Sequence, residues 1–182
     1  MQPNINQLIK DCKKGRQNAQ IQVYDLYARA MFHVARRYLV NHEDAKDAMQ
    51  EGFLKAFLNI NNYKETATFG AWLKRIIINH CIDTHKRRQF VTETLDAKNL
   101  EVVDDTDWQF ESTITKDEIL EAILQLPEKY RIIITLYLVE GYDHEEISEI
   151  LNINIKTSRT QLRRAKLQLR ERLKPKYNEA RY

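Results

Sequence analysis

Basic and polar side chains gather in a short stretch near the end of the chain. Residues 156–176 contain nine basic side chains and one acidic side chain. Arginine can pair bidentately with guanine and glutamine with adenine, whereas lysine and threonine suit contacts with phosphate. These residue types favour recognition of double-stranded DNA, and a basic, solvated helix that closes a small bundle is the alternative. The residues concerned are Lys156, Thr157, Ser158, Arg159, Thr160, Gln161, Arg163 and Arg164.

The elements around this stretch have the pattern of a helix-turn-helix. A capping box of Asp143 and Glu146 predicts the start of a short helix, and Asn152 stands where a tight turn needs a left-handed residue. Asn154 can cap a last helix over about residues 155–173. In such a motif the second helix enters the major groove, with its N-terminal turns against the base edges. The positions of this helix that we expect to face inward are Leu162, Ala165, Leu169 and Leu173.

A second candidate site is acidic. Asp44, Asp47 and Glu51 have the spacing i, i+3 and i+7 on a helix predicted to begin after the cap residue Asn41, and they lie opposite its apolar stripe. Gln50 beside them can form a hydrogen bond. Residues 1–88 carry 15 basic and 8 acidic side chains, so an acidic face here suits a basic protein partner better than DNA. An ordinary solvated face is the alternative.

A polar loop flanked by aromatic residues, 63–69, lies after the acidic helix. A helix over about residues 69–88 is predicted to follow it, with polar and basic residues along one side. Aromatic side chains beside cations can stack on unpaired bases, which offsets the cost of extruding a base from the duplex. Plain core packing is the alternative for Phe69 and Trp72, and it is favoured for Trp72 by its helical spacing with Ile76. The residues of interest are Tyr63, Lys64, Thr68, Phe69, Arg75, Asn79, Lys86, Arg87 and Arg88.

An enzyme or metal site is a weaker interpretation of the same helix. His80, Cys81, Asp83 and His85 lie close together in sequence, but few pairs among them share a helix face and no second ligand cluster is present. We therefore predict no catalytic residues, no metal and no cofactor. His80 is expected to pack on the apolar stripe, and Cys81 is expected to be an inert buried thiol.

The composition predicts an all-α protein of two small helical domains. The chain of 182 residues has only 4 glycines and 3 prolines, too few for many turns or hairpins. Helices are expected over residues 20–39, 41–60 and 69–88. Residues 89–113 lack a sustained period and carry one basic and 7 acidic side chains, which indicates a flexible acidic linker. The predicted organisation is a domain at 1–89, the linker at 90–113 and a second domain at 114–182.

The second domain is expected to begin with a capping box. Thr115 and Glu118 form this box, Pro127 suits the first turn of the next helix, and Gly141 ends that helix. No apolar run is long enough to span a bilayer, and the first residues lack the pattern of a secretory leader. We therefore expect a cytoplasmic protein with reduced thiols and no direct membrane insertion.

Two blocks of motifs resemble the sigma-70 family of bacterial sigma factors. Residues 44–57, DAKDAMQEGFLKAF, are similar to the conserved helix of region 2, and residues 69–76, FGAWLKRI, with Asn79 and the pair 87–88, resemble the rest of that region. Residues 126–131, LPEKYR, through Gly141 to the run 164–166 resemble region 4. Because only a linker lies between the blocks, the chain resembles the extracytoplasmic-function (ECF) group.

This resemblance implies roles for the candidate residues. Asp44, Asp47, Gln50 and Glu51 match the surface that grips the β′ clamp helices of core RNA polymerase. The loop 63–69 and Asn79 match the part that captures a base of the minus-ten promoter element, with Arg75, Lys86, Arg87 and Arg88 on nearby backbone. The recognition-helix positions that read the minus-thirty-five element match Arg159, Thr160, Arg163 and Arg164.

The resemblance also implies partners. The second domain would sit on the flap of the β subunit, and the acidic linker resembles the segment that threads the RNA exit path. An anti-sigma factor is a further expected partner. Ser158 and Gln161 stand where the family often has valine and arginine. The alternative function is a free-standing dimeric helix-turn-helix regulator, which explains residues 114–173 but neither the acidic face nor the loop before Phe69.

Overall fold

The computed structural model describes the backbone of residues 4–89 and 114–179, and the side chains of residues 4–84 and 114–174. Within these ranges every regular element is a helix, which confirms the predicted all-α class. The chain forms two compact units, an N-terminal unit over Met1–Lys86 and a C-terminal unit over Arg87–Tyr182. The predicted linker 90–113 lies outside the described residues.

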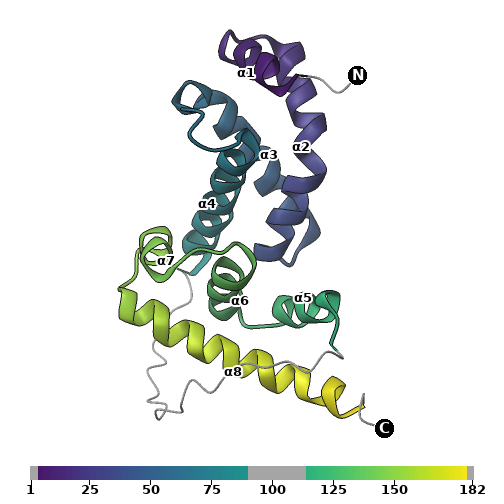
Figure 1. The fold of residues 1–182 in the computed structure, drawn as a ribbon, viewed down its shortest axis with the longest axis vertical. Helices are drawn as coiled ribbons and strands as arrows, with labels where there is room; N and C mark the ends of the chain where they lie inside the picture. The colour runs from purple at the N-terminus through teal and green to yellow at the C-terminus, as the bar shows by residue number, and fades with distance from the viewer. Residues whose placement is uncertain (1–3, 90–113, 180–182) are drawn as a thin grey trace. The chain divides into compact units, whose positions relative to one another are not determined.

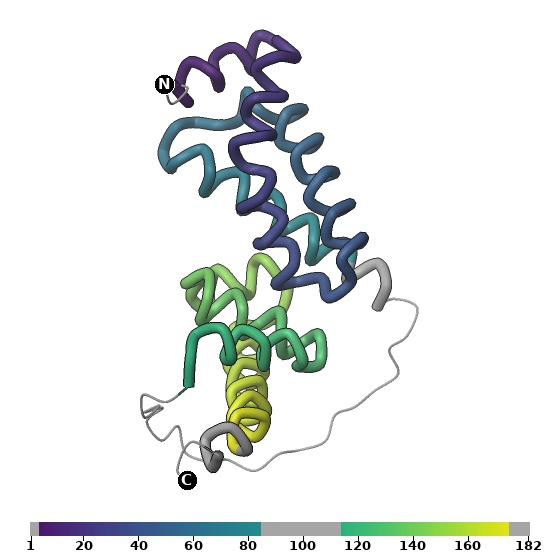
Figure 2. The backbone as a smooth tube through the Cα atoms, turned by 90° about the vertical axis from the view of Figure 1, so that its right-hand side faces the viewer, coloured from purple at the N-terminus to yellow at the C-terminus, as the bar shows by residue number. Residues whose placement is uncertain are grey.

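Four α-helices and one short 3₁₀ helix build the N-terminal unit. They are α1 (Ile5–Lys13), α2 (Gln17–Tyr38), α3 (His42–Leu58), η1 (Ile60–Asn62) and α4 (Phe69–Gln89). The long helix α2 packs against both α1 and α3 (Figures 1 and 2). The core contains the fully buried side chains of Tyr38, Phe53, Leu73 and Ile77. The apolar stripes of the three long helices therefore meet inside this unit, as their spacing predicts.

The sequence did not predict helix α1, and the first helix was expected to begin near Gln20. The Asn4 Oδ1 atom caps α1 by accepting a hydrogen bond from the Asn6 backbone N–H at 3.1 Å. Leu8, Ile9 and Cys12 are buried on one side of it. Gly15 then adopts a φ of +72°, which lets the chain turn back and pack α1 on α2.

The C-terminal unit is arranged around its longest helix. Its elements are α5 (Lys116–Leu124), α6 (Glu128–Ile134), the π-helical segment η2 (Thr135–Val139), α7 (His144–Leu151) and α8 (Ile155–Glu179). Helices α5, α6 and α7 all pack against α8, which runs along the whole unit (Figure 1). The predicted inward positions Leu162, Ala165, Leu169 and Leu173 are all buried.

Most helix ends of the C-terminal unit follow the predicted caps. Thr115 with Glu118, and Asp143 with Glu146, form the two predicted capping boxes. Asn152 adopts the left-handed conformation with φ 52° and ψ 50°, which makes the tight turn between α7 and α8. Pro127 is the N-cap of α6 and does not lie in its first turn as expected.

The helix before Gly141 ends in a π-helical turn, which the sequence did not indicate. The Glu140 backbone N–H donates to the Thr135 carbonyl at 3.0 Å, a π-type step of five residues. Gly141 follows with a φ of +80° and ends this stretch, as predicted. The π-helical segment ends at Val139, a few residues before α7 begins at His144.

Candidate functional site

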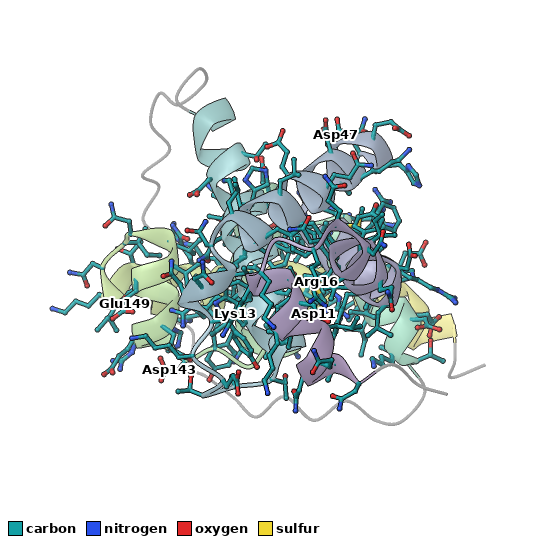
Figure 3. The ribbon with its side chains drawn as sticks, turned by 90° about the horizontal axis from the view of Figure 1, so that it is seen from above. Asp11, Lys13, Arg16, Asp47, Asp143 and Glu149 are labelled. Atoms are coloured by element: carbon teal, nitrogen blue, oxygen red, sulfur yellow. The ribbon has the colours of Figure 1, made fainter. Side chains whose placement is uncertain are left out.

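The acidic residues of α3 lie on its exposed side. Asn41 caps the helix by accepting from the backbone N–H groups of Glu43 at 2.8 Å and Asp44 at 3.1 Å. The apolar stripe opposite is buried in the unit, so Asp47, Gln50 and Glu51 are exposed and Asp44 is half-buried. Asp47 lies at the rim of the N-terminal unit in Figure 3. The structure thus brings the four predicted residues together on one face.

The buried His80 of α4 contacts this acidic face from the interior of the unit. The Lys55 Nζ atom lies 2.7 Å from His80 Nδ1, and His80 Nε2 lies 2.9 Å from Glu51 Oε2. Because a lysine ammonium has only donors, His80 Nδ1 must accept, and the ring proton on Nε2 then donates to the carboxylate. Burial, and next the positive charge of Lys55, lower the pKa of His80, which favours this neutral ring. His80 therefore fixes the position of the Glu51 carboxylate.

Two exposed leucines continue the acidic face along α3. Leu54 is 63% exposed and Leu58 is 84% exposed, both unusually high for leucine. They lie three and seven residues after Glu51, so they share its side of the helix. Sequence reasoning left both leucines outside the core stripe and gave them no role. Their spacing from Glu51 was the signal that could have found them. We call Asp44, Asp47, Gln50, Glu51, Leu54 and Leu58 the docking face.

The aromatic residues around the loop before α4 pack on one another. Tyr63 is 7% exposed and Phe69 is 3% exposed. The ring centroids of Tyr63 and Phe69 lie 5.5 Å apart, and Trp72 lies 5.4 Å from Tyr63. Both rings therefore contribute to the packing of the unit, and their predicted stacking on a base stays a prediction. Trp72, expected in the core, is half-buried.

The loop itself and the outer side of α4 present polar groups. Lys64 and Thr68 are exposed, and Thr68 Oγ1 accepts from the Ala71 backbone N–H at 3.3 Å at the start of α4. Arg75 and Asn79 are also exposed and lie four residues apart, on one side of the helix. The side chains of the predicted basic residues Lys86, Arg87 and Arg88 lie outside the described ones.

The predicted DNA-reading helix is α8, and one of its predicted contact residues is buried. Ser158 is 0% exposed, and its hydroxyl lies 2.9 Å from His144 Nδ1. It joins α8 to α7, and its burial does not support the predicted contact with DNA. The reason is tertiary, because α7 packs over the side of α8 that carries Ser158.

The other predicted residues of α8 remain accessible. Lys156, Thr157, Arg159 and Thr160 are exposed, and Gln161, Arg163 and Arg164 are half-buried. Asn154 caps the helix by accepting from the Lys156 backbone N–H at 2.8 Å. Burial, and next the charge of Arg159, lower the pKa of His144, which stacks on Tyr137 at 5.1 Å. The first turns of α8 thus present a cationic surface.

The described residues hold no group of three or more His, Cys, Asp or Glu side chains that could bind a metal. Burial raises the pKa of the Cys81 thiol to about 12, so this thiol is unreactive. Among the helices of the described chain, none combines the length and apolar character needed to cross a membrane.

Comparisons with known proteins agree with these features. The sigma-70 region 2 family matches residues 23–91, and the sigma-70 region 4 family matches residues 116–169. The ECF RNA polymerase sigma factor SigW of Bacillus subtilis is 32% identical over 189 residues, which cover 96% of this chain and 99% of the relative. The ECF RNA polymerase sigma-E factor of Haemophilus influenzae is 27% identical and covers 92% of this chain and 94% of its own length.

A solved structure shares the fold. The chain resembles the sigma factor RpoE, in its complex with the anti-sigma factor NepR from Bartonella quintana, with a TM-score of 0.54 and 24% sequence identity. The similarity covers 84% of this chain and 95% of that one. At this identity the likeness concerns the fold.

A helical region 2 unit followed by a region 4 helix-turn-helix defines a sigma-70 type transcription factor. The chain belongs to the ECF group of the sigma-70 family and is an RNA polymerase sigma factor. This family is not a family of enzymes. The alternative of a free-standing regulator is not favoured, because both regions match in order and the first has no place in such a regulator.

Proposed function

We propose that the docking face of α3 binds the β′ clamp helices of bacterial core RNA polymerase. The observation that carries this proposal is the cluster of exposed acidic side chains on a unit that is otherwise basic. Opposite charges steer the encounter of two proteins, and exposed leucines gain free energy when a partner covers them. The hydrogen bond from His80 supports the proposal, because it holds Glu51 ready before the partner arrives.

The promoter contacts divide between the two units. In the N-terminal unit, Lys64, Thr68 and Asn79 would capture an extruded base of the minus-ten element, and Arg75 with the run 86–88 would hold the backbone nearby. The exposure of Asn79 and Arg75 on one side of α4 supports this assignment. Sequence selection at this element would come from hydrogen bonds to the unpaired base.

The minus-thirty-five element would be read by the first turns of α8. Lys156 and Thr157 at the helix start would contact phosphate, and arginine and glutamine side chains would read base edges in the major groove. The capped N-terminus of α8 and its exposed cations support this role. The proposed readers are Arg159, Thr160, Gln161, Arg163 and Arg164.

The domain roles and further partners follow from the same proposal. Residues 1–89 would bind polymerase and the minus-ten element, and residues 114–182 would bind the minus-thirty-five element and the β flap, joined by the linker 90–113. An anti-sigma factor would cover these surfaces, and a protein of the same fold, RpoE, is found in complex with the anti-sigma factor NepR. This role requires no catalytic residue and would be performed in the cytoplasm.

Charge reversal on the docking face tests the proposal. Asp47→Lys is expected to weaken binding to core polymerase by at least about tenfold, because it sets a positive charge against a basic partner. Asp25→Lys is the matched control, since Asp25 is an exposed acid of the same unit on a different helix. Competition between each variant and the wild type for core polymerase, with circular dichroism to check folding, gives the result. If Asp47→Lys competes for core polymerase as well as Asp25→Lys does, the docking face is not the polymerase-binding surface.

A further inference from the structure

The loop before α4 is held by a lysine from α1. The Lys13 Nζ atom donates to the Tyr63 carbonyl at 3.2 Å and lies 4.0 Å from Glu65 Oε1. The same ammonium lies 5.7 Å from the centroid of the Tyr63 ring. The side chain of Lys13 is 29% exposed, so the contact is partly shielded from water. Helix α1 packs against η1, which brings it to the end of the unit that carries the loop (Figure 2).

The loop that Lys13 contacts has an unusual backbone. Glu65 adopts a φ of +58°, a left-handed conformation that is uncommon for a residue with a side chain. Such a conformation persists only where the surroundings determine it. The Tyr63 hydroxyl donates to the Ala67 carbonyl at 2.7 Å and closes the loop on its other side. Residues 64–66 are therefore held between two fixed points, and Lys13 supplies one of them.

A lysine is well suited to this position. Its ammonium has three donors, so it can serve a carbonyl and a carboxylate at once while its aliphatic stem packs on a ring. The acidic residue Asp11 of α1 pairs with Arg16, the N-cap residue of α2, since Arg16 Nη1 lies 3.1 Å from Asp11 Oδ1 (Figure 3). Lys13 is thus directed to the loop and not to its acidic neighbour on the helix.

We propose that Lys13 is a positioning residue for minus-ten selection, because it fixes the shape of the loop 63–68 that would surround the captured base. This inference rests on the proposed function of that loop. It concerns a part of the chain that precedes the match to sigma-70 region 2, which begins at residue 23. Helix α1 would then influence promoter choice without touching DNA.

The experiment uses the full chain with core polymerase and a promoter pool that is randomised in the minus-ten element. Lys13→Met keeps an unbranched apolar side chain but removes the donors. Its preference for the favoured base is expected to fall by roughly threefold to tenfold, because the loop loses one fixed point. Lys14→Met is the matched control, since Lys14 is the exposed neighbour and the charge change is the same. Its base preference should equal that of the wild type.

Two further measurements separate positioning from other roles. Lys13→Met should bind core polymerase as the wild type does, since the docking face is unchanged. A uniform loss of affinity for all promoters, with a smaller salt dependence and an unchanged base profile, would mean that Lys13 contacts phosphate directly and would overturn the inference. Equal profiles for Lys13→Met and Lys14→Met would overturn it as well.

If Lys13→Met does not fold, the variant Glu65→Gly tests the positioning role of Lys13 instead. Glu65→Gly accepts the left-handed backbone without strain and removes the carboxylate that faces Lys13. A broadened base profile for this variant supports the inference, and an unchanged profile overturns it. Failure of the wild-type chain to bind core polymerase or to select at the minus-ten element would overturn the proposed function itself, and this outcome is distinct from a failure at Lys13.

Discussion

The hydrogen bond between Ser158 and His144 joins the two helices of the helix-turn-helix near their first turns. His144 is the first residue of α7, and its ring lies between Ser158 and Tyr137. Because Ser158 is fully buried, removing its hydroxyl takes a hydrogen-bond partner from the half-buried ring of His144. The angle at which α8 leaves the turn therefore depends on a polar contact inside the motif.

Replacing Ser158 is expected to change stability and not sequence preference. Ser158→Val should destabilise the C-terminal unit by about 1 kcal/mol, because His144 loses its hydrogen-bond partner. The minus-thirty-five preference should stay that of the wild type. Arg159→Ala is the comparison, since it should cost roughly 1–3 kcal/mol of DNA binding at unchanged stability. Urea unfolding and promoter-pool selection measure the two effects, and an altered preference in Ser158→Val would contradict the buried role.

His80 makes the stability of the N-terminal unit depend on pH. Burial lowers the pKa of His80 below its ordinary value of 6.5, so the unfolded chain binds its proton more readily than the folded one. Stability should therefore decrease as pH falls through about 6.5 and below. His80→Gln should show a smaller decrease between about pH 7.5 and about pH 5.5, because glutamine does not titrate there. Urea unfolding at both pH values tests this, and equal slopes for variant and wild type would contradict it.

At the scale of elements, α3 and α4 lie in close contact at Gly52. A Cβ atom placed on Gly52 would lie 2.3 Å from Ile77 Cδ1 and 3.4 Å from Ile77 Cα. Ile77 is fully buried and has no free space into which it can move. The contact brings the docking face on α3 and the polar side of α4 into one rigid body within this unit.

An alanine at position 52 should separate these helices. Gly52→Ala is expected to destabilise the N-terminal unit by about 1–3 kcal/mol through overpacking. Ile77→Val removes the Cδ1 atom and alone should cost about 0.5–1.5 kcal/mol. The double variant should then be more stable than the sum of the two single effects predicts. Urea unfolding of the wild type, the two single variants and the double variant gives the free energies of unfolding for this cycle. Strictly additive free-energy changes would show that the side chains at positions 52 and 77 do not contact each other.

The sequence predicted where helices begin and end more accurately than which side chains of the candidate site are exposed. Asn41, Thr115, Asp143 and Asn152 could be assigned because caps and turns depend on local hydrogen bonds and backbone conformation. Helix α1 could have been found from Asn4 and the spacing of its buried residues. The π-helical step at Thr135 could not, because an apolar stripe is compatible with either kind of turn.

The candidate site was predictable only where exposure follows from the helix pattern. The acidic face could be predicted, since its apolar opposite side determines which way it points. Phe69 and Ser158 are held by residues more distant in sequence, Tyr27 and His144, and such tertiary contacts cannot be read from a local pattern. A polar or aromatic residue near a functional element has the same local pattern whether it contacts the ligand or supports the element.

At the scale of the whole molecule, the two units divide the proposed functions between them. Fragments 1–89 and 114–182 are expected to fold separately, because each contains its own buried core. The first should compete with the full chain for core polymerase, and the second should bind minus-thirty-five duplex with strong salt dependence. Circular dichroism, polymerase competition and DNA titration test this. An unfolded first fragment, or polymerase competition only by the full chain, would contradict the proposed boundaries.

The two cysteines of the chain offer a way to time the opening of one unit alone. Both thiols, Cys12 on α1 and Cys81 on α4, are buried in the N-terminal unit, and the sequence contains no others. A thiol reagent can therefore react only when that unit opens, and the C-terminal unit stays silent. Faster labelling of Cys12 than of Cys81 would report detachment of α1 while the rest of the core is closed. The labelling rate of Cys12 therefore reports how often α1, the helix that carries Lys13, detaches from the unit.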